Sequence, residues 1–223
     1  MPNIPPSWTM IGLDILMIIY TMWCLSAFKP LGRIGMGIGA AFAAWLLVLH
    51  LGLSSGRLFP QDISGPAFLS IILVGVAAVG AMLFLIPPVR RLLLSLDQRQ
   101  LLLLQGIRVW FGAAFLMQAS LGILPKEFGI VDGFTHVGAG FFGLVAAFSV
   151  ASGLHGVRRA WFANLWGLID ILIVASTLAL VLLPQIGPHH SMMYAVFLPA
   201  PLWLWFHVIS IWKLVRMSGR GHG

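Results

Sequence analysis

Few ionisable side chains lie inside the long apolar stretches of this sequence, and three of them predict one polar centre. Arg108, Asp170 and His207 each stand well within a different apolar run. Counted at the rise of a helix, about 1.5 Å per residue, they lie roughly 10, 12 and 9 Å from the same predicted surface. An ionisable group that faces lipid costs about 3 kcal/mol or more, so we expect all three to face the protein interior. The sequence predicts a charge-assisted contact between Arg108 and Asp170, with His207 within reach.

Two amide side chains are predicted to join this centre. Gln105 lies one turn from Arg108 on nearly the same helix face, and Asn164 lies near the start of the run that contains Asp170. Two interpretations stay open. The five residues serve as a proton relay, a substrate counter-ion or a ligand anchor, or the buried ion pair only fixes the register of the helices.

A second group of polar residues is predicted near the opposite surface. Asp14, His50 and His136 lie roughly 6, 4–5 and 3 Å inside their runs, and Asp132 precedes His136 by one helical turn. Imidazole and carboxylate groups bind zinc, copper or iron, and two histidines can hold a haem from both sides. No spacing typical of a metal motif is present. The sequence therefore leaves two interpretations open, a metal or haem site or a solvated scatter of polar groups.

Seven apolar runs carry these residues and predict the fold. Hydrophobic residues make up 60% of the 223 residues, charged residues 9%, and the mean hydropathy is +0.99. Each run approaches the roughly 20 residues that a helix needs to cross a bilayer. We expect an all-α, seven-helix transmembrane bundle that forms a single domain over residues 1–223. The predicted spans are 10–28, 34–53, 67–86, 101–124, 135–154, 162–183 and 192–213.

Basic residues predict the orientation of the bundle. Ten of the 13 lysines and arginines follow the first, third, fifth and seventh runs: Lys29, Arg33, Arg90, Arg91, Arg99, Arg158, Arg159, Lys213, Arg216 and Arg220. The positive-inside rule then places the N-terminus outside and the C-terminus in the cytoplasm. The net charge of +7 reflects this bias. We therefore expect no nucleic-acid partner; the expected partners are the lipid bilayer and other membrane subunits.

Proline and glycine mark further features. Pro87-Pro88 ends the third run, and Val89–Gln100 is predicted to lie along the membrane surface as an amphipathic helix. Pro199-Ala200-Pro201 interrupts the last run, and the carbonyls freed there must find partners in neighbouring helices or water. Gly138, Gly140 and Gly143 match a dinucleotide motif by spacing, but they lie inside an apolar run and predict close helix packing instead.

The C-terminal half of the chain resembles a known kind of protein. The residues that carry the resemblance are Gln105-x-x-Arg108, Gly122-x-Leu124-Pro125-x-x-Phe128, Asp132, Asn164-x-x-Gly167-x-x-Asp170 and His207. Between Gln105 and Lys213 the sequence is similar to an uncharacterised family of small bacterial polytopic inner-membrane proteins. Where members of the family often have a Gly-Asp pair, this chain has Val131-Asp132-Gly133. The resemblance implies a bacterial inner membrane and no particular activity.

Three functions agree with these observations. The first is a proton-coupled or small-solute transporter, with Arg108, Asp170 and His207 at its polar centre. It requires a water-accessible cavity that reaches these residues from the cytoplasmic side. The second is a redox or pigment-associated subunit that binds haem, a metal or a quinone near the outer face, with His50 and His136 as ligands. The third is a structural subunit of a larger membrane complex. We expect the transporter.

Overall fold

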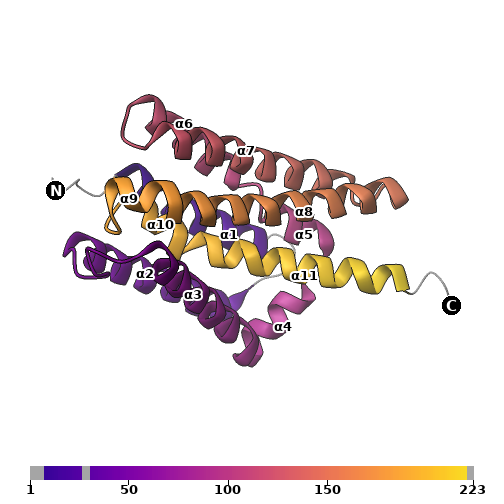
Figure 1. Ribbon diagram of the computed structural model, residues 1–223. Helices are drawn as coiled ribbons and strands as arrows, with labels where there is room; N and C mark the ends of the chain where they lie inside the picture. Colours follow the sequence, from indigo (N-terminus) through magenta and orange to yellow (C-terminus); the bar gives the residue numbers. More distant parts are fainter. Residues whose placement is uncertain (1–7, 27–30, 220–223) are drawn as a thin grey trace.

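The structure is a computed structural model that describes residues 8–26 and 31–219 (Figure 1). The described residues form helices and turns without a strand. Seven helical segments are long and apolar enough to cross a membrane, as expected for a multi-pass membrane protein: Trp8–Ser26, Gly32–Ser54, Gly65–Leu85, Gln98–Ser120, Lys126–Ser149, His155–Ile186 and Met192–Met217. Lys29 and Arg220, two of the basic residues that predict the orientation, lie outside the described residues.

The first three spans are single helices, α1 (Trp8–Ser26), α2 (Gly32–Ser54) and α3 (Gly65–Leu85). The side chain of Ser64 caps the start of α3 by accepting a hydrogen bond from the backbone N–H of Ala67. Most side chains of α2 and α3 are exposed and apolar, so lipid is the medium that suits them. In contrast, one face of α1 is buried against the rest of the bundle.

Prolines at the first two positions begin α4 (Pro87–Ser95), a short helix that turns away from α3. A proline is tolerated there because the first N–H groups of a helix have no intrahelical partner. The arginines of α4 are exposed, and Leu93 is buried. This agrees with the predicted amphipathic segment, although the segment ends earlier than expected. The following helix, α5 (Gln98–Leu103), already enters the core.

The fourth span is interrupted, which the sequence does not predict. Between α5 and α6 (Arg108–Ser120) the chain makes tight turns whose N–H groups bond three residues back, such as Gly106 to Leu103. The hydroxyl of Tyr20 on α1 donates to the carbonyl of Leu103 at 2.7 Å. The carbonyl of Leu103 therefore accepts two hydrogen bonds, one from the N–H of Gly106 and one from Tyr20. Arg108 is therefore the first residue of α6, directly after the interruption.

α6 and α7 (Lys126–Ser149) pack closely along their length, joined by a turn in which Gly122 has a φ of +69°. A Cβ atom added to Gly140 would lie 2.6 Å from the backbone nitrogen of Val109, and one added to Gly112 would lie 2.5 Å from the carbonyl oxygen of Gly133. Glycine is required at both places because the two backbones nearly touch. The glycines of this span are packing residues, as the sequence predicts.

The sixth span is one long rod with a local change of winding. It consists of α8 (Gly153–Thr177), a π-helical segment η1 (Leu178–Leu182) and α9 (Leu183–Ile186). Such single-turn π segments widen a helix locally and are frequent next to functional sites.

The seventh span is broken at its prolines into α10 (Met192–Phe197) and α11 (Pro199–Gly219). Pro201 has no N–H to donate to the carbonyl of Phe197, four residues earlier. The indole N–H of Trp45 on α2 donates to that carbonyl instead, at 2.7 Å. The sequence predicts that a carbonyl freed by these prolines finds a partner in a neighbouring helix or water, and here α2 supplies it.

Two ends of the bundle can be distinguished. The basic end carries α4, the start of α8 and the end of α11, and the opposite end carries the turns after α2, α6 and α9 (Figure 1). In this view α6 and α7 form one edge of the bundle and α2 and α3 the other, with α1, α8, α10 and α11 between them. The core lies where the two interrupted spans meet α1, α7 and α8.

Candidate functional site

Arg108, Asp170 and His207 meet in the middle of the bundle. All three side chains are buried, and they come from α6, α8 and α11. The Nη2 atom of Arg108 donates to Oδ2 of Asp170. The Nη1 atom of Arg108 lies 3.0 Å from Nε2 of His207. The three groups thus lie at one depth, and Arg108 contacts both of the others.

The contacts of His207 fix its proton. A guanidinium can only donate, so Nε2 of His207 accepts the hydrogen bond from Arg108. Its Nδ1 therefore carries the hydrogen and donates to Oδ1 of Asn164 at 2.9 Å. A Cβ atom added to Gly167 would lie 2.2 Å from Nε2 of His207 and 3.3 Å from Nη1 of Arg108. The absence of a side chain at Gly167 makes room for this contact.

His136 belongs to the same cluster, and its predicted place near the opposite surface is wrong. Its Nδ1 atom lies 2.9 Å from Oδ1 of Asp170. The physical reason for the error is the length of α7, which begins at Lys126 and not at residue 135. His136 is therefore deeply placed, with Phe115 and Trp203 packed against its ring.

The polar contacts continue from the cluster toward the basic end. The Nδ2 atom of Asn164 donates to Oγ of Ser210 at 2.8 Å, and Gln98 donates to the same oxygen. Gln105 accepts from Arg108 at 3.2 Å and donates to the carbonyl of Trp203 at 3.3 Å. We refer to this connected set as the polar network: Gln98, Gln105, Arg108, His136, Asn164, Asp170, His207 and Ser210.

The spacing of two short motifs is explained by the network. Asn164, Gly167 and Asp170 are three residues apart and occupy one face of α8, which is the face that meets His207 and Arg108. Gln98 and Ser210 were not singled out from the sequence. Their only signal in the sequence is position. Ser210 follows His207 by three residues, and Gln98 lies near Gln100 at the start of a span.

The other residues of the predicted metal or haem group do not assemble into a metal site among the described residues. Nδ1 of His50 is 2.9 Å from the hydroxyl of Tyr194, and Oδ2 of Asp132 accepts from Thr177 at 2.7 Å. Asp14 is fully buried, and neither of its carboxylate oxygens has a hydrogen-bond partner among the described residues. Within residues 8–26 and 31–219, no three His, Cys, Asp or Glu side chains lie close enough to hold a metal ion.

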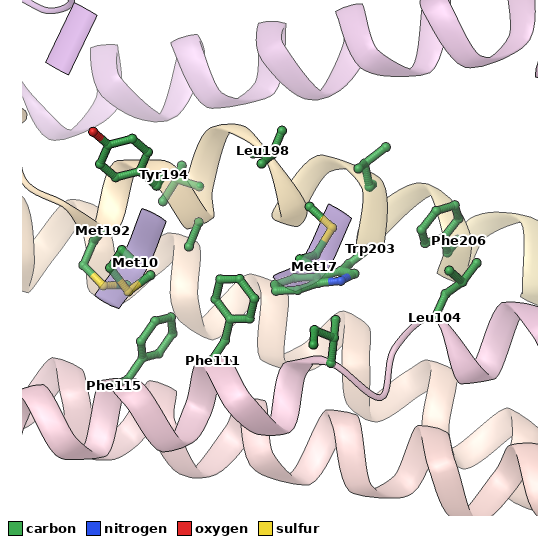
Figure 2. Close-up of a cluster of buried hydrophobic side chains, with 14 of the residues drawn as sticks. Met10, Met17, Leu104, Phe111, Phe115, Met192, Tyr194, Leu198, Trp203 and Phe206 are labelled. Atoms are coloured by element: carbon green, nitrogen blue, oxygen red, sulfur yellow. The ribbon is translucent and has the colours of Figure 1, made fainter. Parts of the chain in front are cut away.

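An apolar cavity of about 60 Å³ borders the cluster. Its polar lining consists of Arg108 and His136, and the rest is apolar, including Phe115, Met192 and Trp203. Figure 2 shows these three last side chains in the packed core between α6 and α10–α11. Each also contributes to the cavity wall.

The half-buried side of the cavity is formed by three helices. Its half-buried lining residues lie on α3 (Ile72 and Val76), on α8 (Ile171, Val174 and Ala175) and on α11 (Ala200 and Leu204), whereas its lining from α10 is buried. Leu178, the first residue of the π-helical segment, completes the wall. The transporter hypothesis requires a water-accessible path from the basic end, but this cavity has apolar walls and opens sideways.

Outside the spans, His190 lies in the turn before α10. Its Nδ1 accepts a hydrogen bond from the backbone N–H of Met192 at 3.2 Å, and Nε2 is buried without a partner among the described residues. Burial lowers the pKa of His190 from its ordinary value of 6.5 to about 4. The imidazole is therefore neutral at pH 7 and caps the start of α10.

Comparison with known proteins adds a family. A family model described as a domain of unknown function, DUF8737, matches residues 66–215, about two thirds of the 223 residues. No curated protein and no solved structure matches the chain. The match contains the whole polar network and begins at α3, so it extends beyond the resemblance seen in the sequence from residue 105 onward. The expectation of a family without an assigned activity is confirmed, and the chain belongs to the DUF8737 family.

Proposed function

We propose that this protein binds a lipid-soluble small molecule with a polar head, inside the membrane, in the cavity beside Arg108 and His136. The observation that carries the proposal is the composition of the cavity wall, which is apolar except at these two side chains. Ligand sites of this type combine an apolar lining with a few convergent polar groups. The polar head would lie against Arg108 and His136, and the apolar tail would leave between α3 and α8.

The size of the cavity supports a head group and not a whole lipid. One water molecule needs roughly 10–15 Å³ of such space, so a cavity of about 60 Å³ takes roughly four to six heavy atoms. A hydroxyl with part of a ring or chain has this size. A longer tail lies in lipid, because the half-buried apolar residues at the opening adjoin exposed apolar residues such as Leu73 of α3 and Leu172 of α8.

This proposal keeps one part of the second hypothesis from the sequence and moves its site. A quinone or a related amphiphile remains a candidate ligand, but the site is in the middle of the bundle and not near the outer face. His136 is retained as a ligand-binding residue. His50 is not, since its Nδ1 contacts Tyr194 and it does not line the cavity.

The test is to extract the protein in a mild detergent and to identify lipid-soluble molecules that co-purify with it by mass spectrometry. We expect about one such molecule per chain. Ala175→Phe places a ring in the cavity wall and should remove it. Leu172→Phe is the matched control, because Leu172 is exposed on the lipid side of the same helix. Equal amounts bound to the wild type and to both variants would contradict the proposal.

A second candidate function is proton-coupled movement of a small solute. It is favoured by the buried ion pair, since intramembrane charges are costly and commonly mark ion or proton pathways. The break at Leu198 between α10 and α11 adds to this, because discontinuous helices often form transport sites. In proteoliposomes with a pH-sensitive dye inside, Asp170→Asn should abolish proton movement that the wild type performs. An equal flux in both would exclude this candidate.

We also infer that the basic end faces the cytoplasm and that the chain forms one bundle in a bacterial inner membrane. The inference is supported by exposed arginines on α4, α5, α8 and α11: Arg90, Arg91, Arg99, Arg158, Arg159 and Arg216. Cysteine introduced at Arg159 should react with an impermeant reagent only in inside-out vesicles, and cysteine at Gln61 only in right-side-out vesicles.

A further inference from the structure

The histidine that meets the cavity has a single free nitrogen. Nδ1 of His136 lies 2.9 Å from a carboxylate oxygen of Asp170. An ionised carboxylate can only accept, so Nδ1 carries the hydrogen of this contact. Nε2 makes no hydrogen bond among the described residues and is not one of the enclosed atoms without a partner. Because His136 lines the cavity, Nε2 is the nitrogen that it presents there.

Asp170 is held in the ionised form that this assignment needs. Its second oxygen accepts from Arg108, and both groups are fully buried. A buried guanidinium without a counter-ion would carry a large desolvation cost, which the carboxylate offsets. Each oxygen of Asp170 thus has a donor, one from Arg108 and one from His136. The neutral His136 therefore presents a lone pair on Nε2 to the cavity.

His207 cannot play this part, although it lies in the same cluster. Both of its nitrogens are occupied, Nε2 by Arg108 and Nδ1 by Asn164. His207 also does not line the cavity. The two imidazoles therefore differ in function, since one is fixed inside the polar network and the other offers an acceptor to a ligand.

Arg108 also contributes to the cavity wall, but its Nε–H is enclosed and cannot meet a group in the cavity. A hydroxyl group can donate one hydrogen bond and accept another. A hydroxyl in the cavity would satisfy Nε2 of His136 by donating to it.

Charge narrows the choice of head group further. Arg108 is neutralised by Asp170, so the cluster carries no net charge for an anionic or cationic head to pair with. An uncompensated charge in such an apolar space is costly. A ketone or ether oxygen would face the lone pair of Nε2 without a hydrogen to share, which leaves the acceptor unpaired. A neutral hydroxyl is the head that fits.

From these contacts we propose that the site selects amphiphiles that carry a neutral hydroxyl donor, such as an alkylphenol or a hydroquinone, and that Nε2 of His136 accepts the hydrogen bond. This inference rests on the proposed function, because it specifies the head group of the ligand in the same cavity. His136 becomes the residue that determines specificity.

The test compares two ligands that differ only at the oxygen. The protein in lipid nanodiscs is titrated with 4-octylphenol and with its methyl ether, 4-octylanisole, and binding is followed by the rise in unfolding temperature. We expect the phenol to bind about tenfold more tightly, as one satisfied hydrogen bond to a buried acceptor implies. In His136→Leu the two ligands should bind equally, while the unfolding temperature without ligand reports whether the variant is folded.

The outcomes separate the two proposals. Equal binding of phenol and ether to the wild type overturns the hydroxyl selectivity and leaves a cavity that binds amphiphiles. Binding of neither ligand overturns the proposed function and with it this inference. A phenol preference that persists undiminished in a folded His136→Leu variant shows that another group accepts the hydrogen bond. The comparison in the wild type requires no variant to fold.

Discussion

Gly167→Ala is the smallest change that tests whether His207 and Arg108 need the space beside Gly167. The added methyl group would lie 2.2 Å from Nε2 and 2.3 Å from Cε1 of His207. Two non-bonded heavy atoms are at their optimal separation at about 3.5 Å, so the ring of His207 must move by about 1.3 Å. It cannot move that far and keep hydrogen bonds of 3.0 Å to Arg108 and 2.9 Å to Asn164.

The expected loss follows from three contributions. A lost hydrogen bond to a charged group costs about 1.5–3 kcal/mol. Overpacking of a filled interior costs about 1–3 kcal/mol. Alanine favours a helix over glycine by about 1 kcal/mol, which acts in the other direction. We therefore expect Gly167→Ala to lower the free energy of unfolding by about 1.5–5 kcal/mol.

The assay is reversible unfolding in mixed micelles, with helix content measured by circular dichroism. Gly37→Ala is the matched control, because a Cβ at Gly37 meets nothing within 4 Å. It should leave stability unchanged or raise it by up to about 1 kcal/mol. His207→Ala should relieve the clash, so the double variant with Gly167→Ala should cost over about 1 kcal/mol less than the two single changes together. Equal stability of the Gly167 and Gly37 variants, or strict additivity, would refute the packing argument.

Three further predictions follow from individual contacts. His190 should make stability depend on pH: burial lowers its folded pKa to about 4, so its contribution is complete above the ordinary 6.5 and is lost as pH falls from 6.5 to 4. The difference corresponds to about 3 kcal/mol, and His190→Gln should flatten unfolding curves measured across this window. Asp170→Asn should cost about 3–5 kcal/mol in the same unfolding assay, because it leaves the guanidinium of Arg108 buried without a counter-ion. Tyr20→Phe should cost about 1 kcal/mol, since the carbonyl of Leu103 then keeps only the N–H of Gly106 as a donor.

Much of the arrangement could be predicted because a membrane restricts what a sequence can do. Apolar length alone gives the seven spans, and depth within a span gives the common level of Arg108, Asp170 and His207. Arg108 and Asp170 could be paired in this way without knowledge of the helix packing. The reason is that lipid leaves a buried arginine few alternatives to a carboxylate on a neighbouring helix.

The place of His136 could not be predicted, because hydropathy hides the start of α7. Lys126, Glu127 and Asp132 interrupt the apolar run, so the span was expected to begin at residue 135. The helix in fact continues back to Lys126, and the nine additional residues move His136 roughly 14 Å deeper than predicted. Asp132 is tolerated there because it is buried against the hydroxyl of Thr177.

The interruption before Arg108 is equally invisible in the sequence. The run around it contains no proline, and its only irregular residue is Gly106. A Cβ at Gly106 would lie 2.6 Å from Leu144 and 2.9 Å from the hydroxyl of Tyr20. Tertiary contacts therefore favour this conformation, since Tyr20 and Leu144 pack against Gly106 and Tyr20 adds a second donor to the carbonyl of Leu103. Contacts between residues so distant in sequence leave no local pattern.

Stability alone gives no reason for a buried Arg108–Asp170 pair. Apolar residues of similar volume in place of a buried ion pair are often neutral or stabilising. What apolar residues cannot do is orient an imidazole: Asp170 holds the hydrogen of His136 on Nδ1, and Arg108 keeps Asp170 ionised for that purpose. The Arg108–Asp170 ion pair is then explained by its effect on His136, whose Nε2 lone pair it directs into the cavity. The rest of the polar network is explained by the need to hold Arg108 in place.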